Sequence, residues 1–157
     1  GEPIRQFEGH TNAVLGVAWR ADGKMLASCG ADNMIMTWNP ANSDRLRSVV
    51  GYTKQISSIR FVGNTNVTVS VSGDHIVRMH NSDNGGQVRI FANTGTDFLY
   101  AVDVTPNSSF VVTGGYDAVL RIWNGTQNNS QPLYQIEPPP LPKENDPSAV
   151  VPDTDER

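Results

Sequence analysis

Paired cysteines, long apolar runs and an excess of positive charge are all missing from this chain of 157 residues. Its single cysteine, Cys29, has no second thiol with which to form an internal disulfide or a metal-binding pair. No apolar run approaches the roughly 18 residues that a membrane-spanning helix needs. The net charge is −4, and −3 of it falls on the segment from Pro138 onward, so the chain lacks the basic surface of a nucleic-acid-binding protein. We therefore expect neither a membrane nor a nucleic acid as a partner.

The motifs of common catalytic and cofactor sites are missing as well. The chain has no Gly-x-Ser-x-Gly nucleophile motif, no phosphate-binding loop and no dinucleotide-binding fingerprint. Its three histidines, His10, His75 and His80, lie on separate segments without carboxylates at the spacing of a metal site. We predict a protein that has no catalytic residues and no bound cofactor or metal ion.

What the chain does contain is an internal repeat with a period of about 42 residues. Three segments align, and each places an aspartate six residues before an aromatic or imidazole side chain. The aspartates are Asp32, Asp74 and Asp117, and the side chains that follow them are Trp38, His80 and Trp123. Such self-similarity indicates a fold built from repeated supersecondary units.

Each repeat contains short β-strand patterns separated by turn residues such as Asp22-Gly23 and Pro106-Asn107. No segment has the apolar stripe of an amphipathic helix. Four short strands per repeat are typical of a β-propeller blade. The predicted strands, with an outer strand before each repeat and one after the last, are Ile4–Phe7, Leu15–Trp19, Met25–Ser28, Ile35–Trp38, Leu46–Val50, Ser57–Phe61, Val67–Val71, Ile76–His80, Val88–Phe91, Tyr100–Val104, Phe110–Thr113, Val119–Trp123 and Leu133–Ile136.

Gly9-His10, Ser28, Asp32 and Trp38 in the first repeat resemble the signature of the WD40 repeat family. The resemblance implies an all-β fold, a partial β-propeller of three blades that are each a four-stranded antiparallel sheet. The blades are predicted at about residues 9–50, 51–92 and 94–136, within a domain that covers residues 1–137. The proline-rich, acidic segment 138–157 is expected to be a disordered tail, because its composition cannot form a core.

In the family, the turn aspartate, a histidine, a hydroxyl residue and the tryptophan form a buried hydrogen-bonded tetrad. Burial of such groups is tolerated only when each is paired. We expect a complete tetrad in the first repeat alone, because Tyr52 replaces the histidine in the second repeat and Thr94-Gly95 replaces the Gly-His pair in the third. The predicted structural residues are His10, Ser28, Asp32, Trp38, Ser70, Asp74, Thr113, Asp117 and Trp123.

WD40 proteins bind partners on the top rim of the ring, through the residue before the turn aspartate and through two positions at the start of the innermost strand. The resemblance places an aromatic group there in the third repeat, and aromatic side chains are enriched at binding hot spots. The alternative is that Phe98 and Tyr100 cover an apolar gap left by the missing histidine. The predicted partner-binding residues are Phe98, Tyr100, Tyr116, Asp97, Gln55, Ser57 and Leu15.

Three blades are fewer than the 4–8 of a closed propeller. We expect the ring to be completed by further blades, on the same longer chain or by self-association, and the first is favoured because the chain opens on Gly1 and ends in an acidic tail. The predicted function is a non-catalytic scaffold for a protein or peptide partner, as the C-terminal part of a larger propeller protein. The Asp-Asn-Gly-Gly stretch at 83–86 and the Thr-Asp-Phe-Leu-Tyr stretch at 96–100 are similar to bacterial WD proteins often encoded with an upstream c-type cytochrome domain. The alternative function is therefore the C-terminal propeller module of a larger c-type cytochrome or other exported enzyme. No compartment is indicated, and a bacterial cytoplasm and a periplasm both fit.

Overall fold

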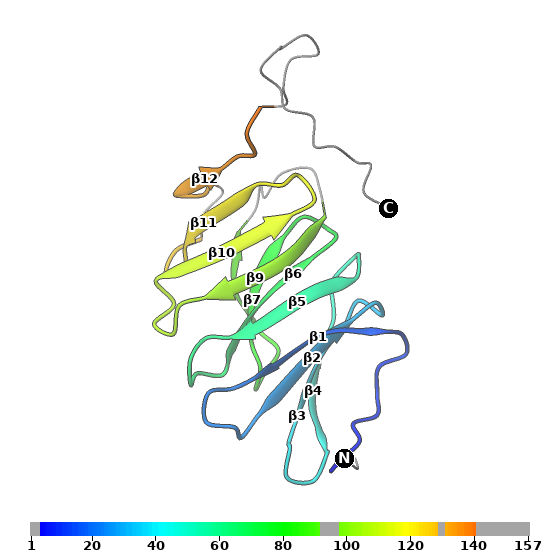
Figure 1. Ribbon diagram of the computed structural model, residues 1–157. Helices are drawn as coiled ribbons and strands as arrows, with labels where there is room; N and C mark the ends of the chain where they lie inside the picture. Colours follow the sequence, from blue (N-terminus) through cyan, green and yellow to red (C-terminus); the bar gives the residue numbers. More distant parts are fainter. Residues whose placement is uncertain (1–3, 92–97, 129–130, 141–157) are drawn as a thin grey trace, which may run out of the picture.

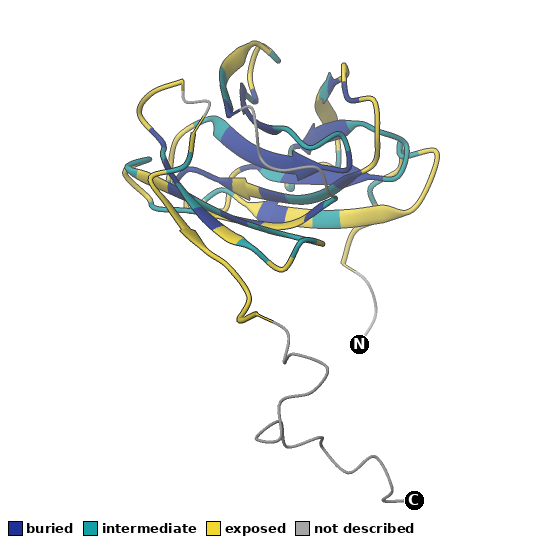
Figure 2. Ribbon diagram, turned by 90° about the horizontal axis from the view of Figure 1, so that it is seen from above, coloured by how far each residue is buried: buried dark blue, intermediate teal, exposed yellow. Residues whose placement is uncertain are grey.

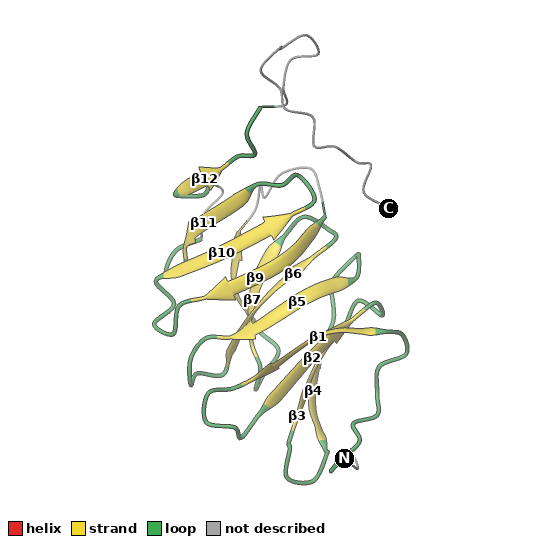
Figure 3. Cartoon of the chain, in the orientation of Figure 1, coloured by secondary structure: helices red, strands yellow, loops and turns green. Residues whose placement is uncertain are grey.

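The computed structural model describes residues 4–91, 98–128 and 131–140 (Figure 1). Within these ranges the chain consists of strands, turns and loops (Figure 3), and none of it forms a helix that is long and apolar enough to cross a membrane. The predicted all-β class is confirmed. Figure 1 shows the sheets following one another in chain order, from the blue sheet near the N-terminus to the yellow and orange sheet.

The described strands form three four-stranded antiparallel sheets, which we call blades 1, 2 and 3. In each blade the strands pair in chain order, so the first strand forms one edge and the last strand the other. Blade 1 contains β1 (Val14–Trp19), β2 (Leu26–Gly30), β3 (Ile35–Trp38) and β4 (Arg45–Val49). Blade 2 contains β5 (Ile56–Phe61), β6 (Val67–Ser72), β7 (Val77–Asn81) and β8 (Gln87–Phe91). Blade 3 contains β9 (Leu99–Val104), β10 (Phe110–Gly115), β11 (Leu120–Asn124) and β12 (Tyr134–Ile136).

The strand predicted at Ile4–Phe7 is wrong. This segment has no strand partner in the structure, and Ile4 is exposed. A lone segment leaves its backbone N–H and C=O groups unpaired unless a sheet edge lies beside it, and none of the three described sheets takes it up. Phe7 instead packs edge-on against Trp38, with ring centroids 5.7 Å apart.

Every blade has two different faces, because paired residues on neighbouring strands point to the same side of a sheet. We call the side that carries Ser28, Ser70 or Thr113 the front face and the opposite side the back face. The back face of blade 1 packs on the front face of blade 2, and the back face of blade 2 packs on the front face of blade 3. The chain therefore contains two interfaces of the same kind.

These two interfaces are the hydrophobic cores of the molecule. Figure 2 shows the buried positions along the strands inside the stack of sheets, with exposed positions in the outer loops. The first core contains Ala18, Met25, Ala27, Cys29, Ile35 and Val49 of blade 1 with Tyr52, Ile56, Ile59 and Phe61. The second contains Val62, Val69, Val71, Val77, Met79 and Phe91 with Leu99, Val102, Val111 and Trp123 of blade 3.

Candidate functional site

The turn between the second and third strands is built in the same way in all three blades. The side chain of the turn aspartate accepts a hydrogen bond from the backbone N–H two residues later, at 3.2 Å for Asp32, 3.3 Å for Asp74 and 3.1 Å for Asp117. The residue between the two partners has a positive φ, of 63° at Asn33, 65° at His75 and 58° at Ala118. We call the end of each blade that carries this turn its top. The contacts of the three aspartates, described below, lie on the front side.

In blade 1, four predicted residues join into one network. His10 Nδ1 lies 2.8 Å from Asp32 Oδ2, and His10 Nε2 lies 2.8 Å from Ser28 Oγ. The indole N–H of Trp38 donates to the same hydroxyl at 2.8 Å. A carboxylate only accepts, so the Nδ1–H of His10 donates to Asp32 and the Ser28 hydroxyl donates to Nε2. The polar atoms that link these four side chains are therefore all hydrogen-bonded.

The surroundings of Asp32 favour its charged form. Burial by itself raises the pKa of a carboxyl, but the hydrogen bonds from His10 and from the backbone N–H of Thr11 outweigh burial. The pKa of Asp32 consequently lies below its ordinary value.

Blade 2 contains a different network at the same place. The hydroxyl of Tyr52 hydrogen-bonds with Ser70 Oγ at 2.7 Å and with His80 Nδ1 at 3.2 Å. Burial raises the pKa of Tyr52. Burial, reinforced by the positive charge of Arg78, lowers the pKa of His80. The Tyr52 and His80 side chains are therefore both held neutral at the position of the histidine and tryptophan of blade 1.

The turn aspartates of blades 2 and 3 are paired with arginines that the sequence analysis missed. Arg78 Nη1 lies 2.8 Å from Asp74 Oδ2, and Arg121 Nη2 lies 2.6 Å from Asp117 Oδ2. Each arginine lies four residues after its aspartate, where blade 1 has Met36. The sequence could have predicted these pairs from the spacing. An arginine at the same position in the two repeats that lack the histidine indicates that the arginine binds the aspartate in place of the histidine.

In blade 3, Trp123 Nε1 donates to Thr113 Oγ1 at 3.1 Å, as Trp38 does to Ser28 in blade 1. Thr94-Gly95, which stands at the Gly-His position, lies outside the described residues. The Trp123 ring packs against Phe91 of blade 2, with centroids 5.9 Å apart. The third repeat thus keeps the hydroxyl–indole half of the tetrad and pairs its aspartate with Arg121.

The structure brings three of the predicted rim residues together at the top of blade 3. The rings of Phe98 and Tyr100 stack with centroids 5.4 Å apart and planes 26° apart. The backbone N–H of Tyr116 donates to the carbonyl of Phe98 at 2.9 Å, which holds the two loops side by side. The side chains of Tyr100 and Tyr116 are 51% and 71% exposed. They are the part of this group that a partner can reach.

Phe98 and Ser57 have structural contacts of their own. The ring of Phe98 lies so close to Gly73 of blade 2 that an added Cβ there would approach it to 2.2 Å. The hydroxyl of Ser57 lies within hydrogen-bonding distance of the backbone carbonyls of Val71 and Leu99. Both side chains therefore tie blade 2 to blade 3, in addition to any role on the rim.

The remaining predicted rim residues are not part of this aromatic group. Gln55 is exposed, and its backbone carbonyl accepts a hydrogen bond from the backbone N–H of Gly73 at 3.0 Å. Leu15 lies on β1 of blade 1 and is exposed. Asp97 lies outside the described residues.

Other kinds of site find little support in the described part of the chain. It contains no cluster of three or more histidine, cysteine or carboxylate side chains able to hold a metal ion. Cys29 is buried, and burial raises its pKa to about 12, which keeps the thiol protonated and unreactive. A mainly apolar hollow lies on the back face of blade 3, away from the aromatic rim. The aromatic rim remains the candidate site.

Comparison with known proteins agrees with this architecture. The family described as "WD domain, G-beta repeat" matches residues 1–39 and 85–124, which is about half of the chain. The stretch between these matches holds Tyr52 and His80, the two tetrad replacements of blade 2.

Several curated proteins are similar over most of the chain. Nuclear distribution protein PAC1 of Arthroderma otae is 30% identical over 142 residues, which cover 83% of this chain and 31% of that protein. Ribosome biogenesis protein WDR12 homolog of Nematostella vectensis is 27% identical over 137 residues, which cover 85% of this chain and 32% of that protein. The chain thus spans about a third of the length of these relatives. Its repeated four-stranded sheets and the match to the repeat show that the chain belongs to the WD40 repeat family.

Proposed function

We propose that this chain is a non-catalytic interaction scaffold that holds a protein or peptide partner on the rim of blade 3. The observation that carries the proposal is the aromatic group at the top of that blade, where Tyr100 and Tyr116 are exposed beside the half-buried Phe98. Tyrosine offers a large apolar surface together with a polar tip, and such side chains are common anchors in protein interfaces.

The rest of the described chain supports a scaffold rather than an enzyme. Buried polar groups such as His10, Ser28 and Trp38 take part in a hydrogen-bonded network within blade 1. The names of the relatives refer to nuclear distribution and to ribosome biogenesis, and not to a chemical reaction.

The proposal also includes completion of the ring by further blades. Closed propellers have 4–8 blades, and the described sheets are three. Additional blades on a longer polypeptide and a second copy of this chain are the two ways to supply them. The narrower resemblance to bacterial proteins with an upstream c-type cytochrome domain stays a prediction, and no residue described above favours it.

Selection from a random peptide library displayed on phage would test the rim. Peptides are selected on the wild-type protein, and their affinity is then measured by calorimetry for a variant that carries Tyr100→Ala and Tyr116→Ala. We expect the variant to bind at least about tenfold more weakly, since removal of a hot-spot anchor commonly costs about 2 kcal/mol.

The matched control is Tyr134→Ala on β12, because Tyr134 is 67% exposed and lies outside the rim. This variant should bind the selected peptides as the wild type does. Failure to enrich any peptide, or equal binding by the rim variant, would show that the aromatic group is not a binding site.

A further inference from the structure

One position on the first strand of each blade, β1, β5 or β9, is exposed in blade 1 and packed in a core in blades 2 and 3. Trp19, Phe61 and Val104 are equivalent residues on the front faces of blades 1, 2 and 3. Phe61 is 7% exposed, because it packs in the core with Met25 and Ala27 on the back face of blade 1. Trp19 is 56% exposed, because none of the described sheets lies against the front face of blade 1.

Val104 repeats the arrangement of Phe61 one blade further along. It packs against the core that contains Val69 of blade 2, together with the partly buried Val67. Val67 and Val69 are the residues of blade 2 that correspond to Met25 and Ala27 of blade 1. Each interface in the chain therefore seats a front-face side chain of one blade in a socket on the back face of the blade before it.

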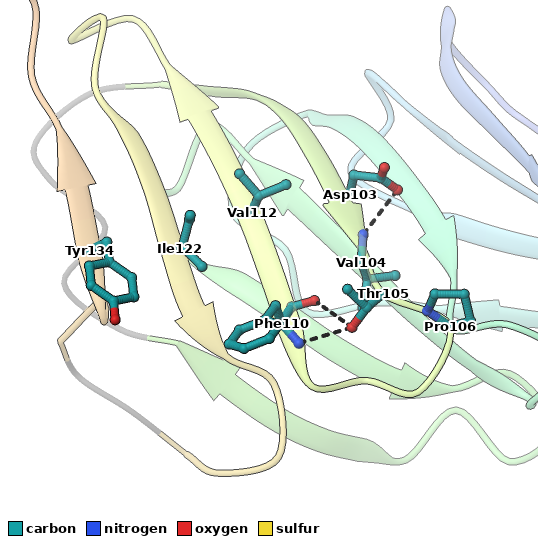
Figure 4. Close-up of a pocket in the computed structure, with 8 residues that line it drawn as sticks. All are labelled: Asp103, Val104, Thr105, Pro106, Phe110, Val112, Ile122 and Tyr134. Atoms are coloured by element: carbon teal, nitrogen blue, oxygen red, sulfur yellow. Dashed lines mark hydrogen bonds between the residues drawn. The ribbon is translucent and has the colours of Figure 1, made fainter.

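No described residue fills the corresponding socket of blade 3. It is formed by Phe110 and Val112, the equivalents of Met25 and Ala27, and it borders a hollow of about 540 Å³ (Figure 4). Pro106, Ile122 and Tyr134 complete its mainly apolar wall. Phe110 is 48% exposed, whereas Met25 at the same place in blade 1 is 7% exposed.

The third strands of the blades show the same difference on their back faces. Ile35 and Val77 are covered by the next blade and are 1% and 0% exposed. Their equivalent in blade 3, Leu120, is 40% exposed. The residues are apolar in all three blades, so the exposure follows the place of a blade in the stack and not its composition.

We propose that the back face of blade 3 binds the front face of blade 1 of a second copy of this chain, with Trp19 of that copy seated in the hollow beside Phe110. The chain carries both halves of an interface that it already forms twice within itself. The hollow of about 540 Å³ beside Phe110 offers room for a large apolar side chain. Trp19 is such a side chain, a tryptophan where the two packed equivalents are phenylalanine and valine. This inference rests on the proposed completion of the ring, but it uses none of the rim residues, so it can fail or hold independently of partner binding on the rim.

The contact is head-to-tail, and such contacts give a closed assembly when the rotation between copies closes a ring. Two copies that each supply three blades would have both faces covered, and six blades lie within the range of closed propellers. We therefore expect a dimer that contains two identical contacts.

Sedimentation velocity of the 157-residue protein would test the proposal first. The expected species has twice the 17.1 kDa mass of the chain. Trp19→Asp and Phe110→Asp should each give a folded monomer, since either one disrupts both contacts of the ring. Circular dichroism checks the fold of the variants, which should be kept because both side chains are about half exposed in the single chain.

A mixture of the two variants gives the sharper test. The Trp19→Asp copy keeps its socket and the Phe110→Asp copy keeps its tryptophan, so one of the two contacts can form. We expect the mixture to contain a heterodimer that neither variant forms alone. A symmetric contact between identical patches would show no such recovery.

Val88→Asp is the control, since it places the same charge at a partly exposed apolar residue on β8 of blade 2, outside both faces, and it should remain a dimer. A folded wild-type protein that sediments as a monomer would overturn the proposal and would favour further blades on a longer polypeptide. A dimer that survives Trp19→Asp, or a mixture of variants that stays monomeric, would also overturn it.

Discussion

The guanidinium carbon of Arg78 lies 4.7 Å from the ring centroid of Tyr52, between the phenol that replaces a histidine and the aspartate that the histidine would bind. A cation held over an aromatic face is attracted by its π electrons. Arg78 thereby joins Tyr52 to Asp74 without any direct bond between the two. Blade 2 keeps a connected network although it has lost both ring residues of the family tetrad.

This arrangement predicts a large loss of stability in Arg78→Met, the change to the residue that blade 1 has at this position. The Asp74 side chain is only 6% exposed, so removal of its partner would leave a buried charge uncompensated. We expect the free energy of unfolding in urea to fall by about 3 kcal/mol. Arg121→Met should cost less, because Asp117 is 20% exposed and water can solvate it. An equal or smaller loss in Arg78→Met would contradict the assignment.

The tetrad of blade 1 should make a measurable contribution to stability. His10→Ala removes the bonds to Asp32 and to Ser28 and leaves both partners buried. A lost buried hydrogen bond costs about 1–3 kcal/mol, and we expect a decrease of that size in the free energy of unfolding by urea. His10→Ala in a protein that already carries Ser28→Ala should cost less, since the two side chains share the network. A loss near zero in the single variant would mean that the network does not stabilise the fold.

His80 should make stability depend on pH. Burial and the charge of Arg78 lower the pKa of His80 in the folded chain, so the unfolded chain takes up the proton at higher pH than the folded chain does. Stability from this residue is therefore present above about pH 6.5, the ordinary pKa, and is lost as the pH falls below it. Urea unfolding between about pH 7.5 and about pH 5 should show this loss in the wild type. His80→Gln should show a smaller slope over the same range, and an unchanged slope would assign the effect to other groups.

Cys29 should be unreactive in the folded protein. Its side chain is fully buried between blades 1 and 2, and burial raises its pKa to about 12. Because the thiolate is the reactive form, a colorimetric thiol reagent at mildly alkaline pH should label no thiol until urea is added. The unfolded protein should then release one equivalent of product for the single cysteine. Rapid labelling without denaturant would show that the interface between blades 1 and 2 opens readily.

Much of the fold could be predicted because its signals are local. The repeat of Asp32, Asp74 and Asp117 marks turns whose hydrogen bonds join residues two positions apart. Alternating apolar residues between such turns predict short strands whatever lies beside them. Ile4–Phe7 has a strand-like composition, yet it forms no strand, because pairing requires a neighbour that a local pattern does not reveal.

The candidate site depends more on contacts between distant segments. The sequence placed Phe98, Tyr100 and Tyr116 on one rim, but it did not predict that Phe98 would cover Gly73 of blade 2 or that the Ser57 hydroxyl would bind backbone carbonyls. These contacts arise where two sheets meet. Arg78 and Arg121 each lie four residues after a turn aspartate and pair with it. The sequence shows this spacing, but the spacing indicates an ion pair only when it is considered together with the missing histidine of the same repeat.

The amino-acid sequence by itself determined the order of strands, the turns and the family of this protein, because these follow from hydrogen bonds and apolar periodicity within a single repeat. The tertiary structure alone decided which apolar side chains are covered. Trp19 and Phe61 occupy equivalent positions, and one is exposed while the other is buried. The burial of a blade face depends on the blade stacked against it, and no residue within the repeat encodes that neighbour.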